Sequence, residues 1–341
     1  WSSVDRQCGF RLAGQFAAWV DSGGYSRGHV VSAPATSTAK RRAFNRVAFD
    51  RDKAVGNCFH MKITYKQLEI LCQIALAAGQ EIMSVYMHGG QTWQKDDASP
   101  LTEADLRADK LIRTRLEESF PGLFILSEES VSNGKAATNT LFLVDPLDGT
   151  KEFLKRNDEF TVNIGFVHLG QVIAGVVFAP ALEELFYAAK GLGAWKQDRQ
   201  GPKAIKVANQ VQGQPVRVTG SRSHGGEALG KWMARLPAQH TFLAAGSSLK
   251  FCRIAEGQAD IYPRLGPTSQ WDTAAGHCIL EMAGGSVTDL HGEPLSYGLN
   301  RPVLNPEFIA ASSKGLLSSL NPKASPPMSP TSCQLEKGGF N

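Results

Sequence analysis

The sequence predicts an α/β fold, a layered α+β sandwich with mixed sheets, and three patterns support this prediction. Apolar residues recur at helical spacing from residue 64 to residue 85. Two apolar segments, 160–168 and 172–178, flank a Leu-Gly-Gln turn and indicate an antiparallel hairpin, which argues against a purely βαβ chain. After residue 215, strand and helix patterns alternate evenly. Sheets packed in layers with helices account for all three patterns.

The first half of the predicted fold begins with two helices. Thr64 is expected to cap the helix whose apolar face repeats through Val85. The residues Thr102-Glu103-Ala104-Asp105 resemble a capping box, which predicts a second helix ending near Ser119. Apolar strands follow, and the first two run directly into acidic residues. The expected strands of this half are 123–126, 141–144, 160–168, 172–178 and 184–189.

The second half is expected to alternate between the two kinds of element. In chain order it comprises strand 216–219, helix 225–235, strand 242–245, helix 248–257, strand 260–262 and helix 271–283. The change of pattern near residue 215 predicts two subdomains, 61–214 and 215–315.

The two ends of the chain differ in composition from the rest. Residues 1–60 hold nine Lys and Arg against four Asp, so the whole formal net charge of +4 lies there. They show no sustained period and are rich in Gly, Ser, Ala and Arg, so we expect a disordered leader outside the fold, upstream of a biological start at Met61. An Arg-rich targeting peptide is the alternative. The Ser/Pro/Lys-rich residues 316–341 are expected to form a disordered tail.

Several classes of protein are excluded by composition. The longest apolar runs fall far short of the roughly 20 residues of a membrane-spanning helix, so we expect a soluble protein with no transmembrane segment. The six cysteines form no C-x-x-C pair, which favours reduced thiols in a cytoplasm over a zinc site. A nucleic-acid partner is suggested by net charge alone, and no basic stripe interleaved with aromatic residues supports it.

Three acidic motifs stand where strands are expected to end or helices to begin. They are Ser127-Glu128-Glu129-Ser130, Asp145-Pro146-Leu147-Asp148-Gly149-Thr150 and Trp271-Asp272-Thr273. A strand-end Glu pair is usually solvated, and an Asp before a helix is usually a cap. The motif that begins at Asp145 is harder to explain by a structural role alone. A turn needs only one Asp or Asn and a Gly, whereas here the carboxylates of Asp145 and Asp148 flank a backbone that a proline restricts.

These motifs predict a divalent-metal site. Asp145 and Asp148, three apart across a tight turn, can place two carboxylates and the Leu147 carbonyl around adjacent ions, and Mg²⁺ prefers such oxygen ligands. The helix that starts after Gly149-Thr150 would direct free N–H groups at a phosphate on the metals. Together with Glu128 and Asp272, the carboxylates carry roughly four negative charges, which about two Mg²⁺ would neutralise.

Two other phosphate-binding signatures do not fit. The haloacid-dehalogenase phosphatases carry Asp-x-Asp-Gly-Thr, with the acids two apart and the first acting as a covalent nucleophile, whereas Asp145 and Asp148 are three apart. A Walker-type loop is absent from the sequence, and Gly191-Leu192-Gly193 is too short for a dinucleotide-binding fingerprint.

Together the three motifs resemble those of the inositol monophosphatase superfamily, Mg²⁺-dependent and lithium-sensitive phosphatases, over about residues 65–311. Further segments resemble the bacterial 3'(2'),5'-bisphosphate nucleotidases of that superfamily, while inositol monophosphatases typically have Thr-Asn-Phe after the Gly-Thr. These segments are Lys151-Glu152-Phe153, Ser221-Arg222-Ser223-His224 and Gly246-Ser247-Ser248-Leu249-Lys250. The resemblance implies a sugar-phosphatase-like αβαβα architecture with mixed sheets, in which 61–214 is the metal-binding subdomain.

The resemblance also implies roles for individual residues. Glu128, Asp145 and the Leu147 carbonyl would hold a first Mg²⁺, and Asp145, Asp148 and Asp272 a second, in a site of two or three ions. Asp105 would pair with Thr150 to help activate the attacking water. The implied catalytic residues are Asp105, Glu128 and Thr150, and the implied substrate contacts are Glu128, Leu147, Asp148, Gly149, Thr150, Asp272, His224 and Lys250.

The activity implied by the resemblance is hydrolysis of the 3'-phosphate of adenosine 3',5'-bisphosphate to AMP and phosphate, within sulfur metabolism, and activity on the sulfate-bearing nucleotide is left open. The second phosphate needs cations, and His224, Lys250, Arg253 and Arg264 are the candidates. A phosphatase for inositol or sugar monophosphates could use the same metal core. A phosphoester sensor without turnover is a further alternative. The expected location is cytoplasmic, with peripheral association at the inner membrane left open.

Overall fold

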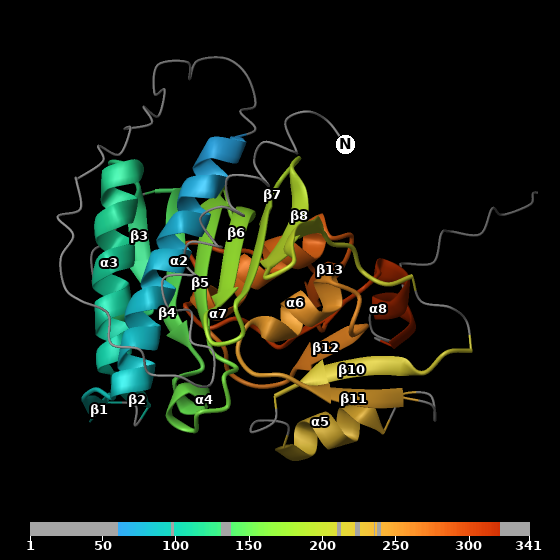
Figure 1. Cartoon of the computed structure of the whole chain (residues 1–341). Coiled ribbons are helices and arrows are strands. Elements are labelled where there is room, and N and C mark those ends of the chain that lie inside the picture. Colours follow the sequence, from blue (N-terminus) through green and yellow to red (C-terminus); the bar gives the residue numbers. More distant parts are fainter. Residues whose placement is uncertain are drawn as a thin grey trace, which may run out of the picture.

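The computed structural model describes residues 61–96, 99–130, 138–209, 213–221, 226–234, 236 and 240–320. The leader expected at 1–60 and residues 321–341 lie outside these ranges. The described part folds into five layers, in which two sheets alternate with three layers of helices (Figure 1). This arrangement is the αβαβα sandwich with mixed sheets that the sequence predicts.

Seven helices are found in these ranges: α2 (Tyr65–His88), α3 (Glu103–Ser119), α4 (Thr150–Leu154), α5 (Gly226–Met233), α6 (Leu249–Ala255), α7 (Gln270–Met282) and α8 (Lys314–Leu320). A 3₁₀ turn, η1, covers Glu128–Ser130. The small hairpin consists of β1 (Thr92–Gln94) and β2 (Pro100–Thr102).

The large sheet has seven strands in the order β3-β4-β5-β6-β7-β8-β9. Their bounds are β3 (Phe124–Ser127), β4 (Thr140–Asp148), β5 (Thr161–His168), β6 (Gln171–Ala179), β7 (Glu184–Ala189), β8 (Gly193–Asp198) and β9 (Gly201–Ala204). Strands β3 and β4 are parallel and the others antiparallel. The predicted hairpin is β5–β6, with the tight turn at Leu169 and Gly170, both at positive φ.

The second sheet has five strands in the order β11-β10-β12-β14-β13. Their bounds are β10 (Val216–Gly220), β11 (His240–Ala244), β12 (Ile261–Arg264), β13 (Ser286–Asp289) and β14 (Phe308–Ala311). Strand β10 is parallel to both of its neighbours, and β14 is antiparallel to both of its own. The subdomain boundary that the sequence predicts near residue 215 falls in the connection between β9 and β10.

Helix α2 forms where the sequence predicts it. The side chains of Thr64 and Gln67 make a reciprocal capping box at its start, and Gly89, at φ 83°, ends it. By length and hydropathy this helix could span a membrane, but 67% of its most apolar window is buried within the fold. Its apolar face and that of α3 cover one side of the large sheet (Figure 1). The length of α2 is therefore explained by core packing.

Helices α6 and α7 fill the layer between the two sheets. Two glycines of the large sheet, Gly165 on β5 and Gly175 on β6, allow α7 to approach closely. A Cβ on Gly175 would lie 2.4 Å from the carbonyl oxygen of Ala275, and one on Gly165 would lie 2.8 Å from the Cβ of Ala274. The close contact fixes the first turn of α7, which carries Asp272, beside the end of β4.

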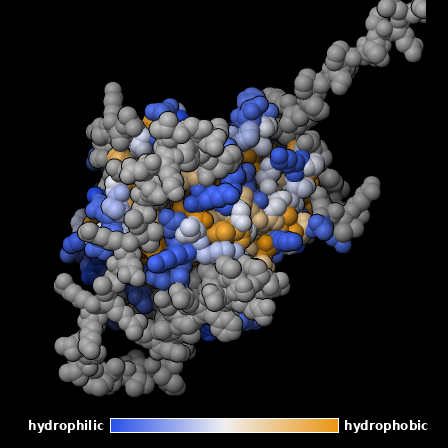
Figure 2. Space-filling model, turned by 90° about the horizontal axis from the view of Figure 1, so that it is seen from above, coloured by the Kyte–Doolittle hydropathy of each residue, from blue (hydrophilic) through white to orange (hydrophobic). Residues whose placement is uncertain are grey.

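The outermost helices, α5 and α8, cover the far side of the second sheet. Leu229 and Trp232 of α5 and Leu316 and Leu317 of α8 are buried there against Val218. Helix α8 was not expected, and its five residues from Leu316 to Leu320 fall within the segment that the sequence predicts as a tail. Hydrophilic and hydrophobic residues are interspersed on the face shown in Figure 2.

Most predicted elements form within a few residues of their expected bounds. Strands β8, β9, β13 and β14 and the β1–β2 hairpin were not predicted. The strands among them are at most six residues long. In β8, β9 and β13, residues such as Gly, Pro, Lys and Asp interrupt the apolar pattern, and β14 is an apolar run of only four residues.

We expect Gly175→Ala to lower the free energy of unfolding by about 1–3 kcal/mol, because the added methyl group meets the backbone of α7 and not a movable side chain. At roughly 2–4 °C per kcal/mol for a chain of this size, the loss is measurable by thermal denaturation. Gly230→Ala is the matched control. It lies in α5 with no atom within 4 Å of the new Cβ, so it should leave stability equal or higher.

Candidate metal and phosphate site

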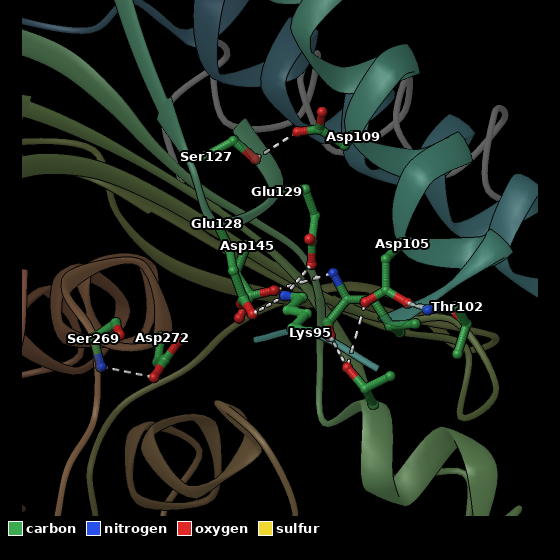
Figure 3. Close-up of polar contacts among 12 residues, drawn as sticks. Lys95, Thr102, Asp105, Asp109, Ser127, Glu128, Glu129, Asp145, Ser269 and Asp272 are labelled. Atoms are coloured by element: carbon green, nitrogen blue, oxygen red, sulfur yellow. Dashed lines mark hydrogen bonds and ion pairs between the residues drawn. The ribbon is translucent and has the colours of Figure 1, made fainter. Parts of the chain in front are cut away.

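Three of the predicted carboxylates converge from separate elements. Glu128 follows the end of β3, Asp145 lies near the end of β4, and Asp272 lies in the first turn of α7. One carboxylate oxygen from each lies within 4.8 Å of the others, and Asp145 is 2% exposed (Figure 3). Such a set of oxygen atoms from three directions has the chemistry and the spacing of a site for a hard divalent cation.

The Asp-Pro-Leu-Asp motif forms an irregular end of β4. Asp145 pairs with Asn163 and Asp148 with Thr161, so the register with β5 shifts between the two acids. The backbone N–H of Leu147 donates to Asp145 Oδ1 at 3.1 Å. Both acids therefore lie at the same end of the large sheet and flank Leu147 in the chain, consistent with the predicted metal ligands.

Asp105 and Thr150, predicted to act together, lie within hydrogen-bond distance. Thr150 Oγ1 is 3.3 Å from Asp105 Oδ1 and 3.3 Å from the Leu147 carbonyl oxygen. Asp105 also caps α3, accepting from both the N–H and the hydroxyl of Thr102 through Oδ2. The capping role and the predicted role at the site therefore use different oxygens of one carboxylate.

The pKa values of these acids are raised by burial. Burial and the nearby Glu128 raise the pKa of Asp145 well above its ordinary value. Burial and the charge of Asp148 raise the pKa of Asp272 to about 7, and burial raises that of Asp105 to about 6. Burial also raises the pKa of Asp148. The cluster thus holds more negative charge than its protein surroundings compensate, and a divalent cation fits this donor set.

Lys95 provides the cation that the protein itself brings to the cluster. Its Nζ donates to Glu128 Oε1 and to Glu129 Oε1, both at 2.7 Å (Figure 3). Burial alone would lower the Lys95 pKa, but these two carboxylates raise it above its ordinary value. The sequence analysis missed this residue, because a single Lys after a three-residue strand has no local pattern that separates it from a solvated one.

The carboxylates open into a cavity of about 810 Å³. Gly149, Thr150, Lys250 and Arg264 line it as well, so most of the predicted substrate contacts share one space. His224 lies outside the described residues. Arg253 does not line this cavity, since its guanidinium pairs with Glu184 and Glu256. The expectation that Arg253 binds the second phosphate is therefore wrong, because its charge is already matched by two carboxylates.

Several polar groups of this cavity lack protein partners. The buried Ser247 Oγ and Arg264 Nε have no hydrogen-bond partner in the described part of the chain. Ser247, also missed as a single residue, adopts a positive φ of 41° and directly precedes Ser248, the N-cap of α6. Lys250 is 6% exposed, and burial lowers the pKa of its ammonium group to about 8. A bound anion would provide acceptors for all three groups and a countercharge for Lys250.

Comparisons with known proteins agree with this geometry. The model of the inositol monophosphatase family matches residues 65–325. The 3'(2'),5'-bisphosphate nucleotidase CysQ of Salmonella typhimurium is 45% identical over 246 residues, which are 71% of this chain and 98% of that protein.

Solved structures extend the similarity to the fold. CysQ from Bacteroides thetaiotaomicron, described as a bacterial member of the inositol monophosphatase family, is 36% identical with a TM-score of 0.63, over 73% of this chain and 98% of that one. An inositol monophosphatase from Anabaena is 28% identical with a TM-score of 0.61, over 77% and 97%.

The raised pKa of Asp272 predicts how the metal-free protein responds to pH. Between pH 3.8 and about 7 the folded state binds more protons at this group than the unfolded state, so its contribution to stability falls as pH rises through that window. Asp272→Asn cannot ionise and keeps an oxygen to accept from Thr268 and Ser269. At pH 8 without Mg²⁺, the variant should melt higher than the wild type by at least about 3 °C.

Thermal denaturation at pH 4 and pH 8 measures this difference. Asp289→Asn, a change of the same kind in a turn of the second sheet, should not show it. Added Mg²⁺ should stabilise the wild type more than Asp272→Asn. If Asp272→Asn melted lower than the wild type at pH 8 without Mg²⁺, the view of Asp272 as an uncompensated buried charge would be incorrect.

Proposed function

Because the chain belongs to the inositol monophosphatase family, we propose that it is a Mg²⁺-dependent 3'(2'),5'-bisphosphate nucleotidase. In this proposal it hydrolyses the 3'-phosphate of adenosine 3',5'-bisphosphate and releases AMP and phosphate, and it also accepts the sulfate-bearing nucleotide. The observation that carries the proposal is a cavity that holds both the carboxylate cluster and a second group of buried donors and cations, Ser247, Lys250 and Arg264. A substrate with two phosphates matches these two groups of residues.

The acidic residues would hold the metal. Glu128, Asp145 and the Leu147 carbonyl would bind one Mg²⁺, and Asp145, Asp148 and Asp272 another, in a site of two or three ions. Bound there, Mg²⁺ supplies Lewis-acid chemistry: it lowers the pKa of water and stabilises charge on the leaving oxygen. A cation at Glu128 would take over the neutralising role that Lys95 has there, while Lys95 could keep its contact with Glu129.

Asp105 and Thr150 would receive the proton of the attacking water. The Thr150 hydroxyl can donate to Asp105 Oδ1, which leaves the Thr150 oxygen free to accept a hydrogen bond from water. Burial raises the pKa of Asp105 to about 6, close to the range in which a general base works best near neutral pH. The Asp105 carboxylate would thus be the final acceptor of that proton.

Lys250, Arg264 and Ser247 would bind the second phosphate, together with His224. The Lys250 ammonium contacts the Ser247 carbonyl oxygen and lies over the ring of Tyr262, which fixes its position in the cavity. Because the pKa of this buried group is lowered to about 8, an anion beside it would favour its charged form. A monophosphate of inositol or a sugar would offer these groups no second phosphate to bind.

We place this enzyme in the cytoplasm, acting on a small nucleotide and not on nucleic acid. The positive net charge that could suggest a nucleic-acid partner comes from residues 1–60 and not from the chain that forms the cavity. Cell fractionation distinguishes a cytoplasmic enzyme from one held at the inner membrane surface.

A phosphate-release panel with Mg²⁺ tests the proposed substrate. We expect kcat/KM for adenosine 3',5'-bisphosphate to exceed that for inositol 1-phosphate, and Li⁺ to inhibit both reactions. Asp145→Asn should lower hydrolysis of every substrate by at least roughly 100-fold, since even outer-shell changes at metal sites cost about 10–100-fold. Faster hydrolysis of inositol 1-phosphate would instead assign the chain to the monophosphatases of its family.

Lys250→Met tests the second-phosphate contact separately. Loss of a hydrogen bond to a charged group costs about 1.5–3 kcal/mol, so kcat/KM for the bisphosphate should fall roughly 10–100-fold. The rate on adenosine 3'-monophosphate should change little, because that substrate lacks the 5'-phosphate. Lys190→Met, at an exposed lysine in the turn between β7 and β8, is the matched control. Equal losses on both substrates would show that Lys250 serves the fold or the metals instead.

A further inference from the structure

Asn163 is a buried polar residue at the centre of the site that neither the motifs nor the carboxylate cluster account for. It lies on β5, is 0% exposed, and stands opposite Asp145 in the register of the large sheet. A buried amide is stable only when its donors and acceptor are bonded, so its partners indicate what it does.

The orientation of the Asn163 amide is fixed by its neighbour on the same face of β5. Thr161 lies two residues earlier, and its hydroxyl donates to Asn163 Oδ1 at 2.9 Å. The amide nitrogen therefore faces the other way, toward two oxygens. Its two hydrogens reach Asp148 Oδ2 at 3.2 Å and Ser248 Oγ at 2.9 Å.

Ser248 extends this network to the other side of the site. Its Oγ lies 3.0 Å from Asp148 Oδ2 and 2.6 Å from the backbone carbonyl oxygen of Asp272. The hydroxyl has one hydrogen, and it already accepts from Asn163, so the shorter contact assigns that hydrogen to the Asp272 carbonyl. The network thus joins β4, β5, the start of α6 and the first turn of α7.

The hydrogen bonds of this network use only one oxygen of the Asp148 carboxylate. Its Oδ2 accepts from Asn163, while its Oδ1 has no hydrogen bond within the described ranges. An Asp148 carboxylate held through one oxygen presents the other in a fixed direction. The same network fixes the backbone at Asp272, from which the second carboxylate of this pair extends.

We propose that Asn163 is a positioning residue for the metal site: with Ser248 it orients the Asp148 carboxylate and the first turn of α7, and so sets the Mg²⁺ affinity of the Asp148–Asp272 pair. This inference rests on the metal assignment of the proposed function. Asn163 touches neither the substrate nor the reacting atoms in this role. It acts through the two acids.

Binding of Mg²⁺ to the full chain, measured by isothermal titration calorimetry, tests the proposal directly. Asn163→Leu keeps the volume and removes both donors, and the dissociation constant for Mg²⁺ should rise roughly 10–100-fold, as for other residues that hold metal ligands in place. At saturating Mg²⁺ the KM for the bisphosphate should stay near the wild-type value. Asn209→Leu, the same change at an exposed position, should alter neither quantity.

Two variants of Thr161 distinguish an effect on the position of the Asn163 amide from a loss of folding. Thr161→Val is nearly isosteric and removes only the hydroxyl that fixes the amide, so Mg²⁺ affinity should fall several-fold. Thr161→Ser keeps the hydroxyl, so its Mg²⁺ affinity should be close to that of the wild type. Melting temperatures without Mg²⁺ show whether each variant is folded. If Asn163→Leu does not fold, the Mg²⁺ affinities of the two Thr161 variants test the proposal instead.

Two results would overturn the proposal. One is a folded Asn163→Leu, or a Thr161→Val, that binds Mg²⁺ as tightly as the wild type. The other is a loss of kcat in these variants with Mg²⁺ affinity unchanged. Failure of the proposed function gives a different result, because the wild type would then bind Mg²⁺ without hydrolysing the bisphosphate.

Discussion

The site is organised around the mutual repulsion of carboxylates that the fold forces together. Asp145 is almost fully buried, and Glu128 and Asp272 approach it within 4.8 Å. Unscreened charges at such distances in a protein interior cost several kcal/mol, so the site can exist only with counter-charge or with bound protons. The raised pKa values of Asp145, Asp148 and Asp272 and the double contact of Lys95 are two forms of the same compensation.

The packing of α7 is what brings these charges together. Gly165 and Gly175 allow the helix to contact the backbone of the large sheet, and Asn305 donates from the β13–β14 connection to the Ser269 carbonyl at its first turn. The large sheet and the β13–β14 connection therefore both hold the first turn of α7, which carries Asp272. Precise placement of ligands on such elements is what distinguishes a metal site from a group of acidic side chains on a surface.

The sequence predicted the layered fold and the acids of the site, because each acid belongs to a short pattern at the end of a strand or the start of a helix. It did not predict Asn163, Ser248 or Lys95 as parts of the site. These residues are brought together by the register of β4 with β5 and by the packing of segments that are distant in sequence. Neither the strand register nor this packing can be recognised from a short sequence pattern. Arg253 shows the converse: three residues from Lys250, it was expected at the phosphate, but two distant glutamates pair with it.

The division of the site between the two halves of the chain has a consequence for synthesis. Glu128, Asp145 and Asp148 leave the ribosome more than one hundred residues before Asp272, which completes the cluster. A nascent chain that ends before α6 carries the acidic strand ends without Asp272 and without the Lys250 side of the cavity. If these residues form the site as proposed, hydrolysis needs the second sheet and α7 to be made and docked, and a chain truncated before them should not act on the nucleotide.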